Sequence, residues 1–199
     1  MADSRWDDVY DRGDSRVSWF QAEPIVSLRL LHDAGLHVGS SVIDVGGGAS
    51  CLADRLVERG VRDVTVLDVA DSALQISRKR LGSAADRVTW LAEDLRQWRP
   101  ARRFDLWHDR ATFHFLTEPG DRAQYASVLQ AALDPHGRVV LGTFAEDGPA
   151  FCSGLPVARY TPADLSAQFP GLKVMRVERE EHRTPWGAVQ PFTWVILCR

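Results

Sequence analysis

The 199-residue sequence predicts a single α/β domain with a doubly wound, mostly parallel sheet. Short apolar segments alternate with segments of helical periodicity, which is typical of parallel strands joined by right-handed helical crossovers. The apolar segments are nearly continuous, as in strands that helices cover on both faces. The last two strand-like segments have no helix between them, so we expect seven strands with an antiparallel strand at the C-terminus.

The helices and strands can be placed from periodicity and from the residues that end them. A first helix is expected over residues 23–36, where apolar residues recur at helical spacing after Pro24. Gly60 and Gly82 close the next two helices. The expected strands are residues 42–45, 64–69, 88–92, 104–108, 139–144, 172–179 and 192–198, and the further helices are residues 49–59, 72–81 and 122–133.

The composition disfavours several classes of protein. The net charge is −3 and no basic block stands out, which gives little support to a nucleic-acid groove. Cys51, Cys152 and Cys198 are far apart, so neither a disulfide framework nor a metal site of the CxxC type is expected. The polar N-terminus lacks the apolar core of a secretion signal, and no apolar stretch reaches the length of a membrane span. A cytoplasmic protein is therefore expected.

The segment VIDVGGGAS, residues 42–50, predicts a short buried strand that runs into a tight turn. Gly46, Gly47 and Gly48 would let a ligand approach bare backbone, and the helix that follows presents free N–H groups. A carboxylate at Asp44 would repel a pyrophosphate and attract a cation. The segment therefore favours a nucleoside that carries an amino-acid tail over a dinucleotide.

Acidic residues also follow the next two strands, where ligands of such sheets bind. Asp68, with the adjacent Val69, is a candidate to accept hydrogen bonds from ribose hydroxyls. Asp94 is a candidate acceptor for the adenine amine, and Leu95 offers its backbone N–H and an apolar edge. Because an acid at a strand end is also a common helix cap, the prediction depends on three acids that follow three successive strands.

These segments resemble the motifs of the class I methyltransferases that use S-adenosylmethionine. VIDVGGGAS resembles the first motif, VTVLDVADSAL the second and WLAEDL the third, while FDLWHDRATFHFL falls at the fourth and LDPHGRVVLGTF resembles the strand that follows. The resemblance covers the chain from the helix after Pro24 and departs from the first motif at Ser50, where glycine is usual. It implies a Rossmann-like fold with a reversed last strand, S-adenosylmethionine as the methyl donor and S-adenosylhomocysteine as the product.

A dinucleotide dehydrogenase is the main alternative for such a fold. Its G-x-G-x-x-G pattern, started at Gly46, would need glycine or alanine where Cys51 stands. No lysine of a P-loop follows the glycines either. The pattern therefore favours the methyltransferase.

In the family, the loop after the fourth strand faces the methyl group that is transferred. By the resemblance, the His108 backbone accepts a hydrogen bond from the ammonium of the methionine tail, and Asp109, Arg110 and His114 lie near the reaction centre. His114 is the candidate general base. Asp109 would orient it or bind a cationic acceptor, and Arg110 indicates either an anionic acceptor or a salt bridge to Asp109. The loop lacks the Asn/Asp-Pro-Pro-Tyr pattern of enzymes that methylate nucleobase or glutamine nitrogens, which argues against nucleic acid as acceptor.

Aromatic residues in the N-terminal segment, residues 1–22, predict a lid over the Rossmann-like core of residues 23–199. Trp19 would pack near the sulfonium or the adenosine, where an aromatic face attracts a cation. The alternative is that Trp6 and Trp19 only anchor the terminus to the core.

The predicted function is methyl transfer to a small molecule by in-line displacement, with the acceptor atom (thiol, other chalcogen, oxygen or nitrogen) left open. The loop of residues 145–156 is expected over the acceptor pocket, where Cys152 is a substrate contact or a small buried thiol, and His182 is a weaker candidate than His114. One alternative is a protein-lysine methyltransferase whose channel has an acidic rim of Glu146 and Asp147. Another is a non-catalytic binder of the donor or its demethylated product. No nucleic-acid or membrane partner is expected, and the sequence leaves the oligomeric state open.

Overall fold

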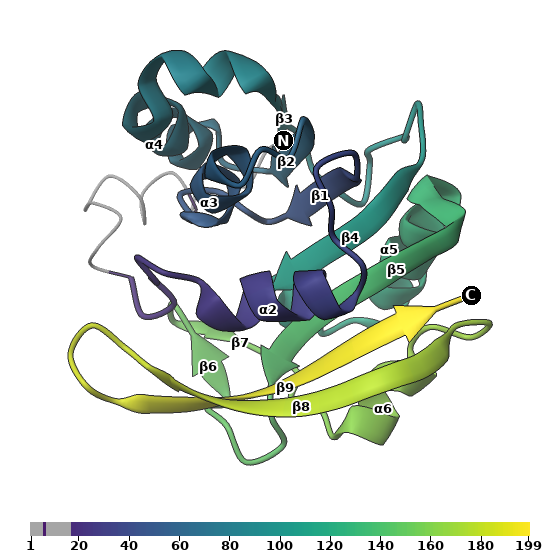
Figure 1. The fold of residues 1–199 in the computed structure, drawn as a ribbon. Helices are drawn as coiled ribbons and strands as arrows, with labels where there is room; N and C mark the ends of the chain where they lie inside the picture. Colours follow the sequence, from purple (N-terminus) through teal and green to yellow (C-terminus); the bar gives the residue numbers. More distant parts are fainter. Residues whose placement is uncertain (1–5, 7–16) are drawn as a thin grey trace.

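The computed structural model describes residue 6 and residues 17–199 of the chain. Seven strands form one sheet in the order β3-β2-β1-β4-β5-β9-β8 (Figure 1). The strands from β3 to β5 pair in parallel, whereas β9 runs antiparallel to both of its neighbours, β5 and β8. This order confirms the predicted doubly wound sheet with an antiparallel strand at the C-terminus.

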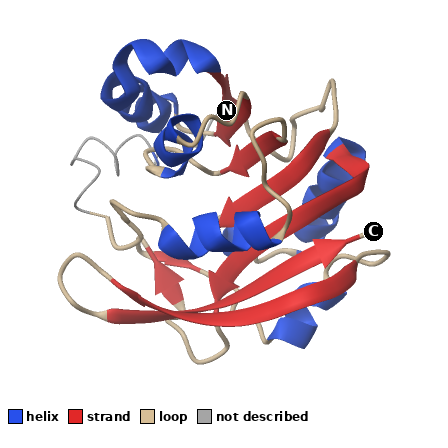
Figure 2. Cartoon of the chain, viewed as in Figure 1, coloured by secondary structure: helices blue, strands red, loops and turns tan. Residues whose placement is uncertain are grey.

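Helices and strands alternate along most of the chain, as predicted (Figure 2). The helices are α2 (Ile25–Asp33), α3 (Leu52–Glu58), α4 (Asp71–Leu81), α5 (Pro119–Ala132) and α6 (Pro162–Ala167). The strands of the sheet are β1 (Ser41–Val45), β2 (Asp63–Asp68), β3 (Val88–Ala92), β4 (Phe104–Arg110), β5 (Leu133–Phe144), β8 (Lys173–Arg183) and β9 (Val189–Cys198). A two-stranded hairpin of β6 (Phe151–Cys152) and β7 (Leu155–Pro156) lies in the loop after β5.

Two helices differ from the sequence-based expectation for local reasons. Helix α3 begins at Leu52 and not at residue 49, because the turn extends to Ser50, whose hydroxyl accepts a hydrogen bond from the Leu52 N–H at 3.1 Å. Helix α6 was not predicted, although the Thr161 hydroxyl accepts a hydrogen bond from the Asp164 N–H at 3.1 Å, as at many helix N-termini.

Two apolar cores fill the space on the two faces of the sheet. Neighbouring residues of a strand point to opposite faces, so Val42 belongs to the core under α2, α3 and α4, whereas Ile43 and Val45 belong to the core under α5 and α6. Figure 1 shows α2 in front of the sheet and α5 and α6 behind it. With both faces covered, the carboxyl ends of the parallel strands are the edge left for a ligand.

The N-terminal segment is described only in part. Residues 1–5 and 7–16 lie outside the described residues, so the lid predicted over residues 1–22 can be followed only at Trp6 and from Val17 onward. In the part of the chain that the structure describes, no helix combines the length and the apolar character needed to cross a membrane.

Candidate functional site

A cavity of about 410 Å³ lies where β1, β2, β3 and β4 end. Its size is in the range of small-molecule sites. One end is formed by residues that follow β2 and β3, and the other by the end of β4 and the β6–β7 hairpin. Its lining residues are Trp6, Trp19, Val45, Gly46, Leu67, Asp68, Val69, Glu93, Asp94, Leu95, Arg96, Arg110, Ala111, Thr112, Phe115, Leu116, Thr117, Asp121, Cys152, Leu155 and Pro156.

A smaller cavity of about 40 Å³ lies at the start of the glycine turn. It shares Trp19, Gly46 and Arg110 with the large one. The predicted site residues that line one or both cavities are Trp19, Asp44, Gly46, Gly47, Asp68, Val69, Asp94, Leu95, His108 and Arg110. Gly48, Asp109 and His114 are not among the lining residues.

The glycine turn needs glycine for two separate reasons. Gly46 has φ +66°, and a Cβ atom there would lie 1.8 Å from Oγ1 of Thr112. Gly47 has no such φ, but a Cβ atom there would lie 2.5 Å from Oδ2 of Asp44. The turn therefore packs against Thr112, in the loop after β4, and against its own strand so closely that side chains are excluded, which leaves backbone at the cavity wall.

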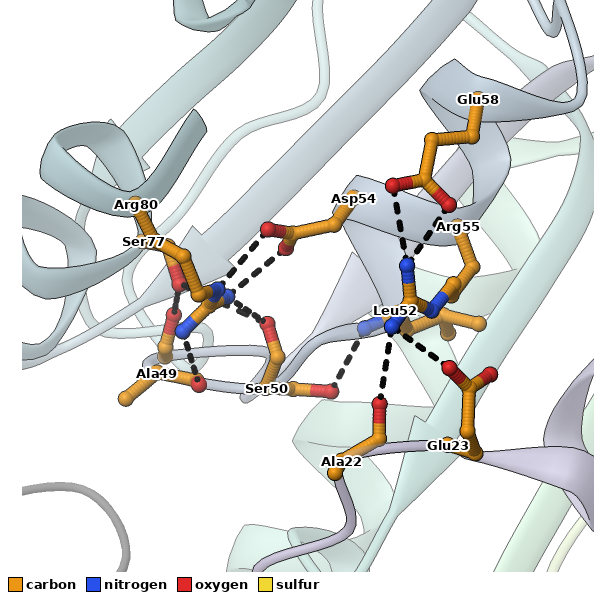
Figure 3. Close-up of polar contacts among 11 residues, drawn as sticks. Ala22, Glu23, Ala49, Ser50, Leu52, Asp54, Arg55, Glu58, Ser77 and Arg80 are labelled. Carbon is orange, nitrogen blue, oxygen red and sulfur yellow. Dashed lines mark hydrogen bonds and ion pairs between the residues drawn. The ribbon is translucent and has the colours of Figure 1, made fainter. Parts of the chain in front are cut away.

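Helix α4 holds the turn from behind (Figure 3). The Ser77 hydroxyl donates a hydrogen bond to the Gly48 carbonyl at 2.8 Å. The Arg80 guanidinium donates to the carbonyls of Ala49 at 3.0 Å and Ser50 at 2.6 Å, and it also pairs with Asp54 of α3 at 2.7 Å. Because three successive carbonyls are bound from the α4 side, the turn is fixed in one orientation toward the cavity. Nothing in the sequence-based prediction pointed to this clamp.

A second polar cluster in Figure 3 anchors the chain just after the predicted lid. Arg55 of α3 pairs with Glu23 at 2.6 Å and with Glu58 at 2.7 Å, and it donates a hydrogen bond to the Ala22 carbonyl at 3.4 Å. The start of α2 is therefore tied to α3.

Asp68 stands at the end of β2 with its carboxyl group at the large cavity. Its Oδ1 accepts a hydrogen bond from the Ala70 N–H at 2.8 Å. Burial raises the pKa of Asp68 to about 7, helped by the charge of Asp44 and opposed by the backbone N–H groups of Ala70 and Gly48. Hydroxyl groups of a ligand would stabilise the ionised form of this carboxylate by donating hydrogen bonds to it. Gly48 therefore affects the site through its backbone, which lowers the pKa of Asp68.

Asp94 also lines the large cavity, but its carboxylate already has a partner. Arg96 donates to it from Nε at 3.1 Å and from Nη2 at 2.8 Å, which lowers the pKa of Asp94. The same guanidinium reaches Asp121 of α5 at 3.3 Å. Neither Arg96 nor Asp121 was predicted as a site residue, and only their place after β3 and at the start of α5 could have indicated them.

Asp44 and His108 lie side by side on the paired strands β1 and β4. Nδ1 of His108 lies 2.7 Å from Oδ1 of Asp44, and its Nε2 lies 3.0 Å from the Ser27 hydroxyl. The prediction concerned the backbone of His108, whereas the structure shows its side chain fixing the Asp44 carboxylate at the smaller cavity.

Arg110 is the last residue of β4 and lines both cavities. Its Nη1 donates to the Trp19 carbonyl at 2.9 Å, and its guanidinium lies 4.6 Å above the Phe192 ring. The Nε and Nη2 atoms are buried and have no hydrogen-bond partner within the described part of the chain. Burial lowers the pKa of Arg110.

Of the two alternatives for Arg110, the salt bridge to Asp109 does not form. Asp109 is buried and accepts hydrogen bonds from the Thr112 N–H at 2.9 Å, the Phe113 N–H at 3.1 Å and the Tyr125 hydroxyl at 2.6 Å. These donors account for both oxygens, so the carboxylate faces the turn after β4 and α5. Asp109 therefore does not orient His114 either, because both of its oxygens are bound to these other groups.

His114 is fully buried in the structure. The Phe144 N–H donates to its Nδ1 at 3.4 Å, so the ring hydrogen is placed on Nε2, which has no partner in the described chain. Burial, together with the charge of Arg110, lowers the pKa of His114 to about 3. A neutral ring with its lone pair turned to the backbone is poorly suited to remove a proton, so the geometry disagrees with the predicted general base.

Aromatic rings cover the large cavity. Trp6 contacts Trp19 and Phe115 edge to face, with ring centroids 6.3 Å and 4.9 Å apart. His182 lies behind this cover, where its Nε2 is 2.8 Å from the Ser18 carbonyl. The structure thus brings both predicted tryptophans to the cavity and gives His182 an anchoring contact to the chain beside Trp19.

The β6–β7 hairpin closes the other end of the cavity, as expected of the loop over residues 145–156. Cys152 lines it, and burial raises the pKa of its thiol to about 12. Cys152 is therefore a neutral thiol at pH 7. Ala111, which follows Arg110, has φ +68°, a conformation that costs energy for a residue with a Cβ atom and that the sequence does not reveal.

The chain is similar in sequence to known methyltransferases. A family model described as a methyltransferase domain matches residues 42–137. Probable thiol methyltransferase 2 of Arabidopsis thaliana is 27% identical over 177 residues, which are 85% of this chain and 75% of that protein. EEF1A lysine methyltransferase 2 of Mus musculus is 26% identical over 179 residues, with 79% of this chain and 72% of that protein covered.

A solved structure extends the likeness to the whole fold. The 1,6-didemethyltoxoflavin-N1-methyltransferase of Burkholderia thailandensis, crystallised with 1,6-didemethyltoxoflavin and S-adenosylhomocysteine, has a TM-score of 0.73 at 20% identity. The match covers 98% of this chain and 84% of that one. Strand order, glycine turn and matched domain lead to one assignment: the chain belongs to the class I methyltransferases, enzymes that use S-adenosylmethionine as methyl donor.

Proposed function

We propose that the protein transfers the methyl group of S-adenosylmethionine to a small molecule. The observation that carries this proposal is the closure of the cavity beyond Asp68. Trp6, Trp19 and Phe115 cover it, and Cys152 with the rest of the β6–β7 hairpin closes its far end. A cavity of about 410 Å³ that also receives the donor leaves room for a compact acceptor.

The residues at the strand ends fit the donor. Asp68, Asp94 and Leu95 line the large cavity, which supports Asp68 as the acceptor for the ribose hydroxyls and Asp94 with Leu95 as the contacts of adenine. Asp44, beside the glycine turn, offers a negative charge to the ammonium of the amino-acid tail. The donor supplies a methyl group on a positively charged sulfur, which is already activated for displacement.

The protein's contribution is then alignment and exclusion of water. Trp19 and Phe115 shield the reacting atoms, and the turn held by Arg80 keeps the donor in register with the acceptor. His114 is neutral and its lone pair faces Phe144, so no proton is passed to it. An acceptor must therefore reach the cavity already able to attack carbon.

Protein-lysine methylation is the second candidate, which the mouse relative favours by its name. Two observations weigh against it. Arg110 places a positive charge at the acceptor end, where a lysine ammonium would have to enter. The predicted acidic rim is also partly neutralised, because Asp147 pairs with Arg179 at 2.9 Å. The expected cytoplasmic location stays a prediction.

The test is formation of S-adenosylhomocysteine by the purified protein, measured by mass spectrometry with a panel of small thiols, amines, phenols and carboxylates. A peptide library that contains lysine serves as the competing arm. The proposal expects turnover with a small molecule, and turnover with the peptides alone would replace it by the second candidate.

A further inference from the structure

Among the described residues that line the large cavity, Arg110 is the one whose side chain has buried hydrogen-bond donors without partners. Its Nη1 is bound to the Trp19 carbonyl, whereas Nε and Nη2 donate to nothing in that part of the chain. Burying a guanidinium without an ion pair is costly, and the usual compensation is an anion. A ligand that supplies one would restore the missing bonds.

The acidic and potentially acidic groups around Arg110 do not fill that role. Asp109 faces away from Arg110, toward Tyr125 and the turn after β4. Glu180 of β8 attracts the guanidinium from a distance, but its oxygens accept hydrogen bonds from Gln21 at 2.9 Å and Trp194 at 2.8 Å. Burial raises the pKa of Cys152 to about 12, so it is no thiolate at pH 7. Among the described residues no carboxylate oxygen is therefore bound to Nε or Nη2 of Arg110, and a bound anion would supply the acceptor that these donors lack.

The surroundings of Arg110 favour the acceptor over the donor as the source of that charge. The guanidinium stacks on Phe192 of β9, and its charge acts on His114, His182 and Cys152. Phe192, His182 and Cys152 come from β9, β8 and β6, and His114 follows β4. Arg110 also borders the smaller cavity beside Asp44 and the glycine turn, so the donor's carboxylate is the competing source of the charge. The aromatic and neutral character of the groups around Arg110 suits a soft, weakly hydrated anion.

We propose that the acceptor reacts as an anion, a thiolate or a related sulfur anion, held by Nε and Nη2 of Arg110. This inference rests on the proposed function. A thiol loses its proton to solvent, and Arg110 stabilises the thiolate. The thiolate sulfur then forms a bond to the methyl carbon while the bond from that carbon to the donor sulfur breaks. The electron pair stays on the donor sulfur, which leaves a neutral methyl thioether and S-adenosylhomocysteine.

The binding test uses thiocyanate, a sulfur anion that needs no deprotonation, titrated calorimetrically into the complex with S-adenosylhomocysteine. Arg110→Met removes the charge at similar side-chain length. Arg110→Lys keeps the charge but loses the planar arrangement of several N–H donors. Arg138→Met is the matched control, because Arg138 also donates to one carbonyl, that of Ala34, has a buried Nε without a partner, and does not line either cavity.

Wild type and Arg138→Met should bind thiocyanate equally, and Arg110→Met should bind it at least about tenfold more weakly, with Arg110→Lys in between. Affinity for S-adenosylhomocysteine should stay unchanged throughout. The inference would be overturned if Arg110→Met bound thiocyanate as tightly as wild type, or if the wild-type complex did not bind thiocyanate. Neither result would affect the proposed function. Loss of S-adenosylhomocysteine affinity in Arg110→Met would assign the guanidinium to the donor's carboxylate instead. Wild-type protein that does not bind S-adenosylhomocysteine would remove the proposed function itself.

A kinetic readout separates a charge effect from loss of packing. With 2-mercaptoethanol as acceptor, the pH profile of kcat reports the pKa of the bound thiol. Arg110→Met should move its midpoint upward by about one pH unit or more, since a contacting cation lowers an acid's pKa by that amount. Arg110→Lys should restore part of the shift, and an unchanged midpoint would contradict the proposal.

Discussion

The two ends of the large cavity differ in the sign of the charges that line them. At the end formed by β1, β2 and β3, the acids Asp44, Asp68 and Asp94 stand at the carboxyl ends of successive strands. At the other end the cation Arg110 is surrounded by aromatic rings and a neutral thiol. Under the proposed function, donor and acceptor are recognised separately, and we expect that each end can be altered without the other.

The largest effect is expected from Gly46→Ala at the donor end. The new Cβ would lie 1.8 Å from Oγ1 of Thr112, and the residue would keep φ +66°. Overpacking and backbone strain should together cost about 2–4 kcal/mol of unfolding free energy and abolish donor binding. Gly82→Ala is the control, because Gly82 has φ +58° with open space around it, so it should lose only the cost of backbone strain, about 1–2 kcal/mol. Urea unfolding of both variants measures the difference, and equal losses would contradict the packing argument.

Asp68→Ala should weaken binding of S-adenosylhomocysteine about a hundredfold, because hydrogen bonds from two ribose hydroxyls to a carboxylate are lost. Calorimetric titration measures this. Asp63→Ala is the matched control: Asp63 begins the same strand and pairs with Arg102, and it does not line either cavity. A similar loss in both variants would show that the effect is on the strand and not on the site.

The pH dependence of donor binding follows from the pKa of Asp68, about 7. Below that pH the carboxylate is protonated before it can bind the ribose, so affinity should fall by up to about tenfold per pH unit. Calorimetry between pH 5 and 8 should show this slope, and Asp68→Asn should remove most of it. A wild-type affinity that is flat over this range would count against Asp68 as the ribose acceptor.

The same pKa has an opposite consequence for stability without ligand. In the unfolded chain the Asp68 pKa is near 3.8, so the folded state binds more protons between pH 4 and 7 and loses stability as the pH rises through that window. Asp68→Asn should therefore stabilise the ligand-free protein at pH 8, by up to about 4 kcal/mol. Thermal unfolding at pH 5 and pH 8 measures the change, and equal shifts at both pH values would contradict it.

The smallest effect is expected from the clamp behind the turn. Arg80→Met removes the donors to the Ala49 and Ser50 carbonyls without touching the cavity wall, so affinity for S-adenosylhomocysteine should fall about tenfold or less. Thiocyanate binding to the saturated complex should not change. If the clamp variant weakened thiocyanate instead, the two ends would be coupled, against the comparison above.

The donor end could be predicted from the sequence and the acceptor end only in part. Strand ends are visible in apolar patterning, so the acids that follow β1, β2 and β3 could be placed at one edge before the structure was known. The direction of a side chain after a strand depends on turn geometry. The positive φ of Ala111 and the hydrogen bonds of Asp109 to Thr112 and Tyr125 therefore could not be anticipated.

Long-range contacts set the remaining limits. The position of Arg80 behind the glycine turn and the burial of His114 under Phe144 depend on how separate elements pack. His114 has the side chain of a general base, but desolvation and the charge of Arg110 determine its pKa, and neither can be derived from residue spacing. Residue type thus predicts the chemistry that is available, whereas burial decides whether it is used.

The most direct test of the central claim measures both ends in one set of titrations. Wild type, Asp68→Ala and Arg110→Met are each titrated with S-adenosylhomocysteine and then, at saturation, with thiocyanate. We expect Asp68→Ala to weaken only the first binding step and Arg110→Met only the second. If either variant weakened both steps equally in a folded protein, the separation of a donor end from an acceptor end would be wrong.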